Sequence, residues 1–235
     1  MTGQKAFSEA LTWEAEKGNL LVILSKNGDQ DPIYIDVPAS WMWHSYNAFE
    51  QGGKIIADFI GYEEPDHFLG DQAAFHRIMD GHLGMAKAKG LPRRYEIDLA
   101  GRKATETILA DASLEFPVLH PSVGCHAHTV GFSTMGIENA IFHSAVARYD
   151  FLSGKLTHYD FGSGNHLGEA VFVLNPDSPA DEGRGWLLTL GLEQESGRSF
   201  LAILDAQALT NGPVATLKLD HHTPISFHGA WHPAG

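Results

Sequence analysis

The sequence has little cysteine, little positive charge and no long apolar run. Cys125 is the only cysteine, which excludes an internal disulfide. Lys and Arg together number 16 against 29 Asp and Glu, and the net charge of −13 excludes nucleic acids as principal partners because their phosphates would be repelled. No apolar stretch approaches the ~18 residues that span a bilayer, which excludes a transmembrane helix. A peripheral contact with a membrane stays open.

The first twenty residues are too polar and too charged to form the apolar part of a signal peptide. With a single cysteine in the chain, this predicts a reducing compartment and therefore a cytoplasmic location. The hydrophobic fraction of 43% excludes intrinsic disorder, and 235 residues can bury a core without a disulfide framework or a structural metal. We therefore expect a single domain over residues 1–235.

Short apolar or alternating runs that end at Gly, Asn or Asp recur along the chain and predict an all-β protein. Their regular spacing is typical of a sandwich, a barrel or a propeller. A repeated order of bulky residue, acidic residue, turn and strand favours the propeller, and at roughly 40 to 50 residues per blade the chain supplies at most about five blades. The predicted strands are residues 20–24, 33–37, 55–60, 94–99, 105–109, 145–149, 156–161, 171–174, 186–192, 200–204 and 215–219.

One short helical insertion is predicted over residues 71–89. It begins at Asp71 and places four apolar side chains on roughly one side of a helix, namely Phe75, Ile78, Met79 and Leu83. We expect this segment to cross between two strands as a loop that contains a helix.

Two of the 14 histidines lie among aromatic residues, which predicts that they are buried. They are His44, in the sequence WMWHSYNAFE, and His228, in FHGAW. A neutral imidazole binds Fe, Zn or Cu, and a buried metal-bound histidine usually donates its second N–H to a carboxylate. Glu115 and Glu169 lie on or beside apolar strands, where an unpaired charge is costly, so both need partners. Taken singly, a histidine beside aromatics is more often an ordinary core residue than a ligand.

A second group of metal-binding side chains occurs in the stretch Gly124-Cys-His-Ala-His128, with His120 nearby. In a strand, His126 and His128 would face the same side, but no second cluster in the sequence completes four ligands. We therefore expect an adventitious or surface role. The sequence contains no Gly-rich phosphate loop, nucleophile elbow, C-x-x-C or H-E-x-x-H motif, so phosphoryl transfer, acyl transfer and zinc proteolysis lose support.

Four segments, in the same order and at similar spacing, resemble motifs of the carotenoid cleavage oxygenase family, particularly of its lignostilbene dioxygenase-like and apocarotenoid branches. The resemblance spans nearly the whole chain and is weakest over residues 70–93. The segments are H-x-x-N-A-F-E at His44, Asn47, Ala48, Phe49 and Glu50; E-F-P at Glu115, Phe116 and Pro117; G-E-x-V-F-V at Gly168, Glu169, Val171, Phe172 and Val173; and F-H-G-x-W at Phe227, His228, Gly229 and Trp231.

This resemblance implies a seven-bladed β-propeller with a non-haem Fe(II) held by four histidines, three of which are oriented by glutamates. Carried over residue by residue, His44 matches the third iron ligand and His228 the fourth. Glu115 and Glu169 match two of the orienting carboxylates. We expect Glu115 to pair with His44, and Glu169 to pair with His228.

The resemblance also implies a reaction. An Fe(II)-dependent dioxygenase of this kind cleaves a conjugated C=C bond of a carotenoid, apocarotenoid or stilbene-type substrate into two carbonyl products. The expected partners are thus a hydrophobic polyene or stilbene-type molecule and O2. An iron that binds O2 beside an apolar alkene needs neutral ligands and open coordination positions, so the lack of a catalytic triad agrees with this hypothesis.

Members of the family are much longer, and this chain begins just before the third-ligand segment. Two ligands, one glutamate and several blades of the family have no counterpart here, so we expect a fragment, the C-terminal part of a propeller, whose open strand edges a complementary N-terminal chain would cover. Val118 and Ala170 depart from the family pattern and leave the substrate open. Two alternatives are a non-catalytic partial propeller that binds a partner chain or a hydrophobic ligand, and a split enzyme assembled from two chains.

Overall fold

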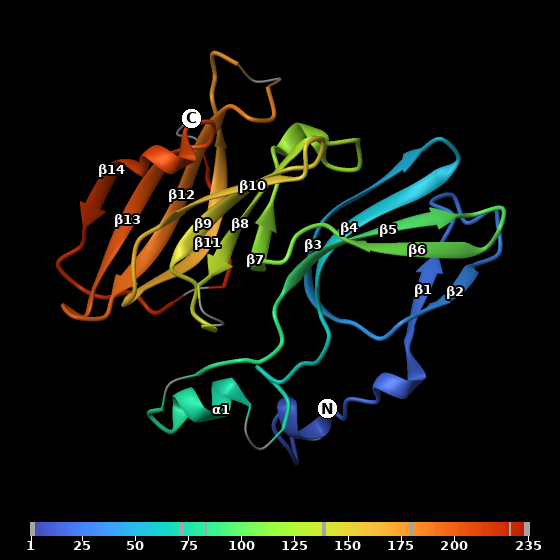
Figure 1. Cartoon of the computed structure of the whole chain (residues 1–235), viewed down its shortest axis with the longest axis horizontal. Coiled ribbons are helices and arrows are strands. Elements are labelled where there is room, and N and C mark those ends of the chain that lie inside the picture. Colours follow the sequence, from blue (N-terminus) through green and yellow to red (C-terminus); the bar gives the residue numbers. More distant parts are fainter. Residues whose placement is uncertain are drawn as a thin grey trace.

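The computed structural model describes residues 3–70, 73–82, 84–137, 140–178, 181–225 and 227–232, and in these ranges it contains four antiparallel β-sheets (Figure 1). A hairpin of β1 (Asn19–Ile23) and β2 (Ile33–Val37) precedes three four-stranded sheets. The first contains β3 (Trp41–Gln51), β4 (Lys54–Tyr62), β5 (Leu91–Asp98) and β6 (Lys103–Ile108); the second contains β7 (Ser113–Val118), β8 (Val130–Gly136), β9 (Ala145–Asp150) and β10 (Lys155–Asp160); the third contains β11 (Asn165–Leu174), β12 (Gly185–Glu193), β13 (Arg198–Asp205) and β14 (Pro213–Lys218). Short 3-10 turns occupy Ser8–Ala10, Ala15–Lys17, Pro121–Val123 and Leu209–Asn211.

Each four-stranded sheet has the topology of a propeller blade, because every strand pairs with its neighbour in the sequence. The first strand of the second blade, β7, contacts the first strands of the other two blades, β3 and β11. The chain is therefore an all-β partial propeller, as predicted. The strands β3, β7 and β11 also carry most of the side chains that the sequence singles out.

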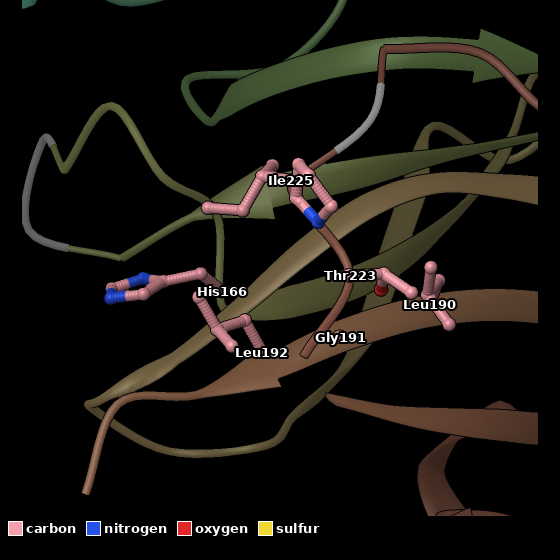
Figure 2. A pocket seen from close by; sticks show the side chains of 7 residues that line it. His166, Leu190, Gly191, Leu192, Thr223 and Ile225 are labelled. Atoms are coloured by element: carbon pink, nitrogen blue, oxygen red, sulfur yellow. The ribbon is translucent and has the colours of Figure 1, made fainter. Parts of the chain in front are cut away.

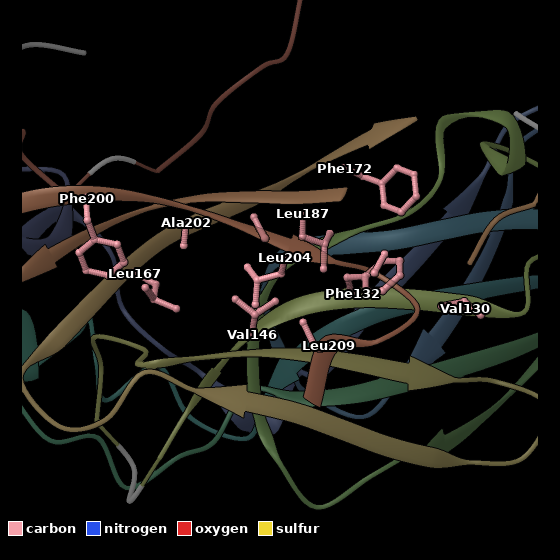
Figure 3. Close-up of a cluster of buried hydrophobic side chains, with 12 residues drawn as sticks. Val130, Phe132, Val146, Leu167, Phe172, Leu187, Phe200, Ala202, Leu204 and Leu209 are labelled. Carbon is pink, nitrogen blue, oxygen red and sulfur yellow. The ribbon is translucent and has the colours of Figure 1, made fainter. Parts of the chain in front are cut away.

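In the described part of the chain, three groups of buried apolar side chains hold the sheets together. One lies between the second and third blades and includes Phe132, Phe172, Leu187 and Leu204 (Figure 3). Another joins the first and second blades around Leu114, and a third packs the β1–β2 hairpin onto the first blade. Each fully buried side chain of this size stabilises the fold by about 1.5–3 kcal/mol. Packing between blades therefore fixes their relative positions.

Three strands, β3, β7 and β8, lie outside the predicted set. β7 contains Pro117 and β8 contains Gly131 and Gly136, residues that normally mark turns or bulges rather than strand interiors. In β3, two register shifts interrupt the alternation of buried and exposed residues. Pairing with neighbouring strands outweighs these local signals, and a single sequence does not reveal that pairing.

The helical insertion is much shorter than predicted. The helix α1 comprises only Ala74–Met79, and Gly81 follows it with a φ of +80°, a left-handed conformation that glycine adopts without strain. Met79, which the prediction places on the apolar side, is 85% exposed. Asp71 and Leu83 lie outside the described residues. The predicted helix is therefore wrong for the described residues that follow Met79.

None of the helices within the described ranges is long and apolar enough to cross a bilayer. The cytoplasmic location and the single domain over residues 1–235 stay predictions.

Candidate metal centre

His44 and Glu115 come from two different blades and meet in a short hydrogen bond. His44 lies on β3 and Glu115 on β7, and the distance from His44 Nδ1 to Glu115 Oε2 is 2.6 Å. The Glu115 side chain is only 10% exposed and that of His44 is 26% exposed. A buried carboxylate that accepts the Nδ1 proton fixes both the tautomer and the orientation of the imidazole ring.

His228 and Glu169 form the second predicted pair. The distance from His228 Nδ1 to Glu169 Oε1 is 3.4 Å, and the backbone N–H of Gly229 donates to Glu169 Oε2 at 2.9 Å. Glu169 lies on β11, and its side chain is less exposed than that of His228, at 18% against 58%. The prediction that the aromatic neighbours bury His228 is therefore wrong. The pairing contacts that the sequence leads us to expect are therefore present, while the roles of ligand and orienting carboxylate stay predictions.

The segment that leads to His228 lies across the third blade. Thr223 and Ile225 pack beside Gly191 of β12 and line a shallow pocket with His166 (Figure 2). The Thr223 N–H donates to Ser199 Oγ at 2.8 Å, and the Ser199 N–H donates to the backbone oxygen of His221 at 3.1 Å. These contacts hold residues 221–225 against the third blade, although these residues have no regular secondary structure.

The Nε2 atoms of His44 and His228 face each other at a distance of 3.3 Å. Because a carboxylate lies at Nδ1 of each ring, the favoured tautomer leaves a lone pair on each Nε2. Two such lone pairs repel each other unless a cation lies between them. Two nitrogens that each lie about 2.1 Å from one ion are about 3.0–3.4 Å apart for octahedral to tetrahedral angles. The pair therefore fits a transition-metal ion, and neutral imidazole suits iron, zinc and copper.

The charges around the two rings attract positive charge. The hydrogen bond to Glu115 raises the pKa of His44, burial acts in the opposite direction, and the charges of Glu115 and Glu169 raise it further. Glu115 and Glu169 thus both favour a cation at the His44 imidazole, whether that cation is a proton or a metal ion. The two compete for the same nitrogen lone pair.

Each of the three strands that carry this site has a register shift at the functional residue. The shift in β3 lies between Met42 and Ser45, around His44. The shift in β7 begins at Glu115, and that in β11 lies between Leu167 and Ala170, around Glu169. Next to Glu115, Phe116 has a φ of +52°, which is unusual for a residue with a side chain. Bulges of this kind redirect side chains, and here they occur where the four residues converge.

The four residues do not complete a metal site by themselves. Across the ranges described by the structure, no group of three or more His, Cys, Asp or Glu side chains is arranged to hold an ion. His44 and His228 offer two nitrogens, and their partner carboxylates are engaged with the rings and the backbone. By themselves, the four residues therefore offer a metal ion two nitrogens and no further ligand.

A model of the family described as RPE65, retinal pigment epithelial membrane protein, matches residues 1–233. The chain belongs to this RPE65/carotenoid cleavage oxygenase family. The match covers nearly every residue, and it confirms the resemblance that the four sequence motifs indicate.

Curated relatives and solved structures agree with the family assignment. The chain is 30% identical to apocarotenoid-15,15'-oxygenase of Synechocystis over 97% of its length and 46% of that protein. It is 31% identical to isoeugenol monooxygenase of Pseudomonas nitroreducens over 97% of its length and 49% of that protein. A cobalt-substituted structure of the Synechocystis oxygenase superimposes with a TM-score of 0.84 at 30% identity, covering 95% of this chain and 46% of that one. The chain therefore spans about half the length of the curated relatives it matches.

In this member of the RPE65 family, sequence reasoning missed Tyr62 as a part of the site. Tyr62 is the last residue of β4, and its hydroxyl donates to Glu115 Oε1 at 3.2 Å. The two residues are 53 positions apart, and no local pattern marks the tyrosine. Phe116 and Phe227 lie within the quoted motifs, and the Phe116 ring centroid is 5.2 Å from that of His44 and 6.2 Å from that of Phe227.

The stretch Gly124–His128 does not form the strand in which two histidines would share a face. It is a loop in which His126 is exposed and His128 is buried, so the expected surface role is wrong for His128. His128 Nε2 lies 3.0 Å from Asp58 Oδ2 on the first blade. Asn47, a residue of the first family motif, accepts from the Cys125 N–H at 2.9 Å and donates to the His126 carbonyl at 2.9 Å. These residues anchor the loop to the first blade.

Proposed function

We propose that His44 and His228 are two ligands of the Fe(II) ion of an oxygenase that cleaves a conjugated C=C bond into two carbonyl products. The observation that carries this proposal is the pair of Nε2 atoms facing each other at 3.3 Å, each ring having a glutamate at Nδ1. The relatives named as oxygenases support iron over zinc, because Zn²⁺ has no redox chemistry of its own.

In the proposed reaction, the ion and the side chains have different roles. When bound, Fe(II) would supply the activation of O2 beside the alkene. Glu115 and Glu169 hold the Nδ1 protons and keep each Nε2 lone pair directed into the site. The overall reaction breaks one C=C bond and transfers one atom of O2 to each carbon, so no external reductant is needed.

The surroundings of the two rings favour a hydrophobic, conjugated substrate. The Phe116 ring centroid lies 5.2 Å from that of His44 and 6.0 Å from that of His228. Phe227, next to His228 in the sequence, is 64% exposed and presents an apolar surface beside the site. Flat aromatic side chains pack well against planar conjugated molecules. The proposed substrates are therefore a carotenoid, an apocarotenoid or a stilbene-type molecule, together with O2.

Two histidines alone would bind iron weakly, so the proposal requires further ligands. Because the chain spans about half the length of its relatives, we infer that these ligands come from other residues of a longer protein or from a complementary chain. Either source would contribute nitrogens from the open side of the His44–His228 pair.

The test is the metal content and turnover of the protein with and without one ligand. The 235-residue chain is purified anaerobically, passed over a sizing column and analysed for iron, and the full-length protein is assayed with apocarotenoid and stilbene-type substrates. We expect His228→Ala to abolish both iron binding and turnover in the full-length protein. The matched control is His222→Ala, an exposed histidine outside the site. Full activity in His228→Ala would refute the assignment, and a full-length wild type without metal would favour the non-catalytic alternative.

A further inference from the structure

Tyr62 connects the first blade to the carboxylate that orients His44. Its hydroxyl donates to Glu115 Oε1 at 3.2 Å, while Glu115 Oε2 accepts from His44 Nδ1 at 2.6 Å. The backbone N–H of Phe116 also donates to Oε2. Without Tyr62, both remaining hydrogen bonds would act on one oxygen, and the other oxygen would have no donor among those found in the described residues.

The Tyr62 ring is held in place from several directions. The phenol packs against Gly90. A Cβ at position 90 would lie 2.8 Å from the phenol oxygen, so a larger residue there would displace the Tyr62 ring. The ring of the buried His67 lies 4.5 Å away between centroids, and His67 Nε2 accepts from Trp43 Nε1 at 2.7 Å. The hydroxyl therefore has little freedom to leave Glu115.

Tyr62 can act only as a donor in this contact. Its side chain is buried, and burial together with the charge of Glu115 raises its pKa well above the usual range for tyrosine. A protonated phenol beside an ionised carboxylate gives a charge-assisted hydrogen bond, which is stronger than one between neutral groups. This bond favours one rotamer of Glu115 over the others.

We propose that Tyr62 is a positioning residue of the metal centre. It holds Glu115 in the rotamer in which the carboxylate takes the Nδ1 proton of His44, and it thereby keeps the Nε2 lone pair of His44 directed at His228. The effect on a metal ion rests on the proposed function, whereas the effect on the His44 ring does not. Loss of an outer partner of this kind typically weakens metal binding about 10- to 100-fold.

The chain offers a matched control for this proposal. Tyr46 is also buried in the group of apolar side chains between the first and second blades, and its hydroxyl donates to Ser133 Oγ at 3.1 Å. Tyr46→Phe and Tyr62→Phe each remove one buried hydroxyl and keep the ring. Only Tyr62→Phe removes a contact with Glu115.

The experiment compares the two variants with the wild-type chain by NMR with ¹⁵N-labelled histidine, without metal. The His44 signals are assigned by their loss in His44→Gln. We expect the His44 Nδ1 proton to exchange with water at least tenfold faster in Tyr62→Phe than in the wild type or in Tyr46→Phe. Equal exchange rates in the two phenylalanine variants would overturn the proposal.

A titration with Co²⁺ then tests the consequence for metal binding. We expect the dissociation constant of Tyr62→Phe to be about tenfold higher than that of Tyr46→Phe. If the wild-type chain and the full-length protein both fail to bind cobalt, the proposed function fails, and the exchange rates of the Nδ1 proton still decide the role of Tyr62. A change in proton exchange with unchanged cobalt affinity would overturn the link to the metal.

Discussion

His143 supports the backbone of Glu115 from the protein interior, and it makes the fold sensitive to acid. The Thr134 hydroxyl donates to the Glu115 carbonyl at 3.0 Å, so His143 Nδ1, 2.8 Å from the same hydroxyl, must be the donor in the second contact. Burial lowers the pKa of His143 to about 4, and the charge of Glu115 offsets this effect only in part. The folded protein thus holds this ring neutral at pH values where the unfolded chain protonates it.

The sign and size of the effect follow from this difference. Between pH 6.5 and pH 4 the unfolded state binds more protons than the folded state, so stability is lost as the pH falls through this window. A pKa lowered from 6.5 to about 4 corresponds to about 3 kcal/mol in total, of which about 2 kcal/mol is lost between pH 7.5 and pH 5.

The assay is urea unfolding followed by tryptophan fluorescence at pH 7.5, 6 and 5. His143→Gln keeps a hydrogen-bond donor but does not titrate, and we expect its unfolding free energy to fall by about 2 kcal/mol less than that of the wild type over this range. His158→Gln, which removes an exposed histidine of β10, is the control and should follow the wild type. The reasoning is refuted if His143→Gln and the wild type lose the same stability between pH 7.5 and pH 5.

Two further predictions concern buried carboxylates. Glu115→Gln removes the negative charge and leaves one acceptor oxygen where Glu115 uses two, so we expect cobalt affinity to fall about 10- to 100-fold in a titration, and unchanged affinity would contradict the orienting role. Asp58 is fully buried and accepts two hydrogen bonds from Arg94 at 2.7 and 2.8 Å, so Asp58→Asn should cost about 3–5 kcal/mol in urea unfolding. Glu96→Gln, which breaks an exposed pair with Lys54, should cost far less because solvent screens the two charges, and equal losses in the two variants would argue against a special role for burial.

The sequence predicts the parts of the fold whose alternation is regular. β2, β10 and β13 coincide closely with predicted strands because they contain no proline or glycine and because more and less buried residues alternate over most of their length. The alternation does not predict β3 and β7, because the register of both strands shifts at the site residues His44 and Glu115. The irregularities that direct His44 and Glu115 are thus the same ones that hide their strands.

The candidate site divides in a similar way. His44, Glu115, Glu169 and His228 are predicted because each lies in a short motif that can be compared with a family. Tyr62 could not be predicted, because its contact with Glu115 depends on the packing of β4 against β7 and leaves no mark in the neighbouring sequence. A motif identifies residues that match a family in type and spacing. It does not identify a residue such as Tyr62, which reaches the site only through packing between blades.

His44 and His228 are separated by 184 positions in the sequence, yet their rings face each other. In an unfolded chain, closing a loop of that length would cost about 5 kcal/mol in conformational entropy by the chain-entropy model. In the folded protein, the three blades already hold the two rings together before an ion binds. An ion that contacts both rings would therefore bind the folded chain several thousandfold more tightly than the unfolded chain. Metal affinity would therefore report how well the first and third blades pack together. A substitution buried between two blades could weaken metal binding without contacting a ligand.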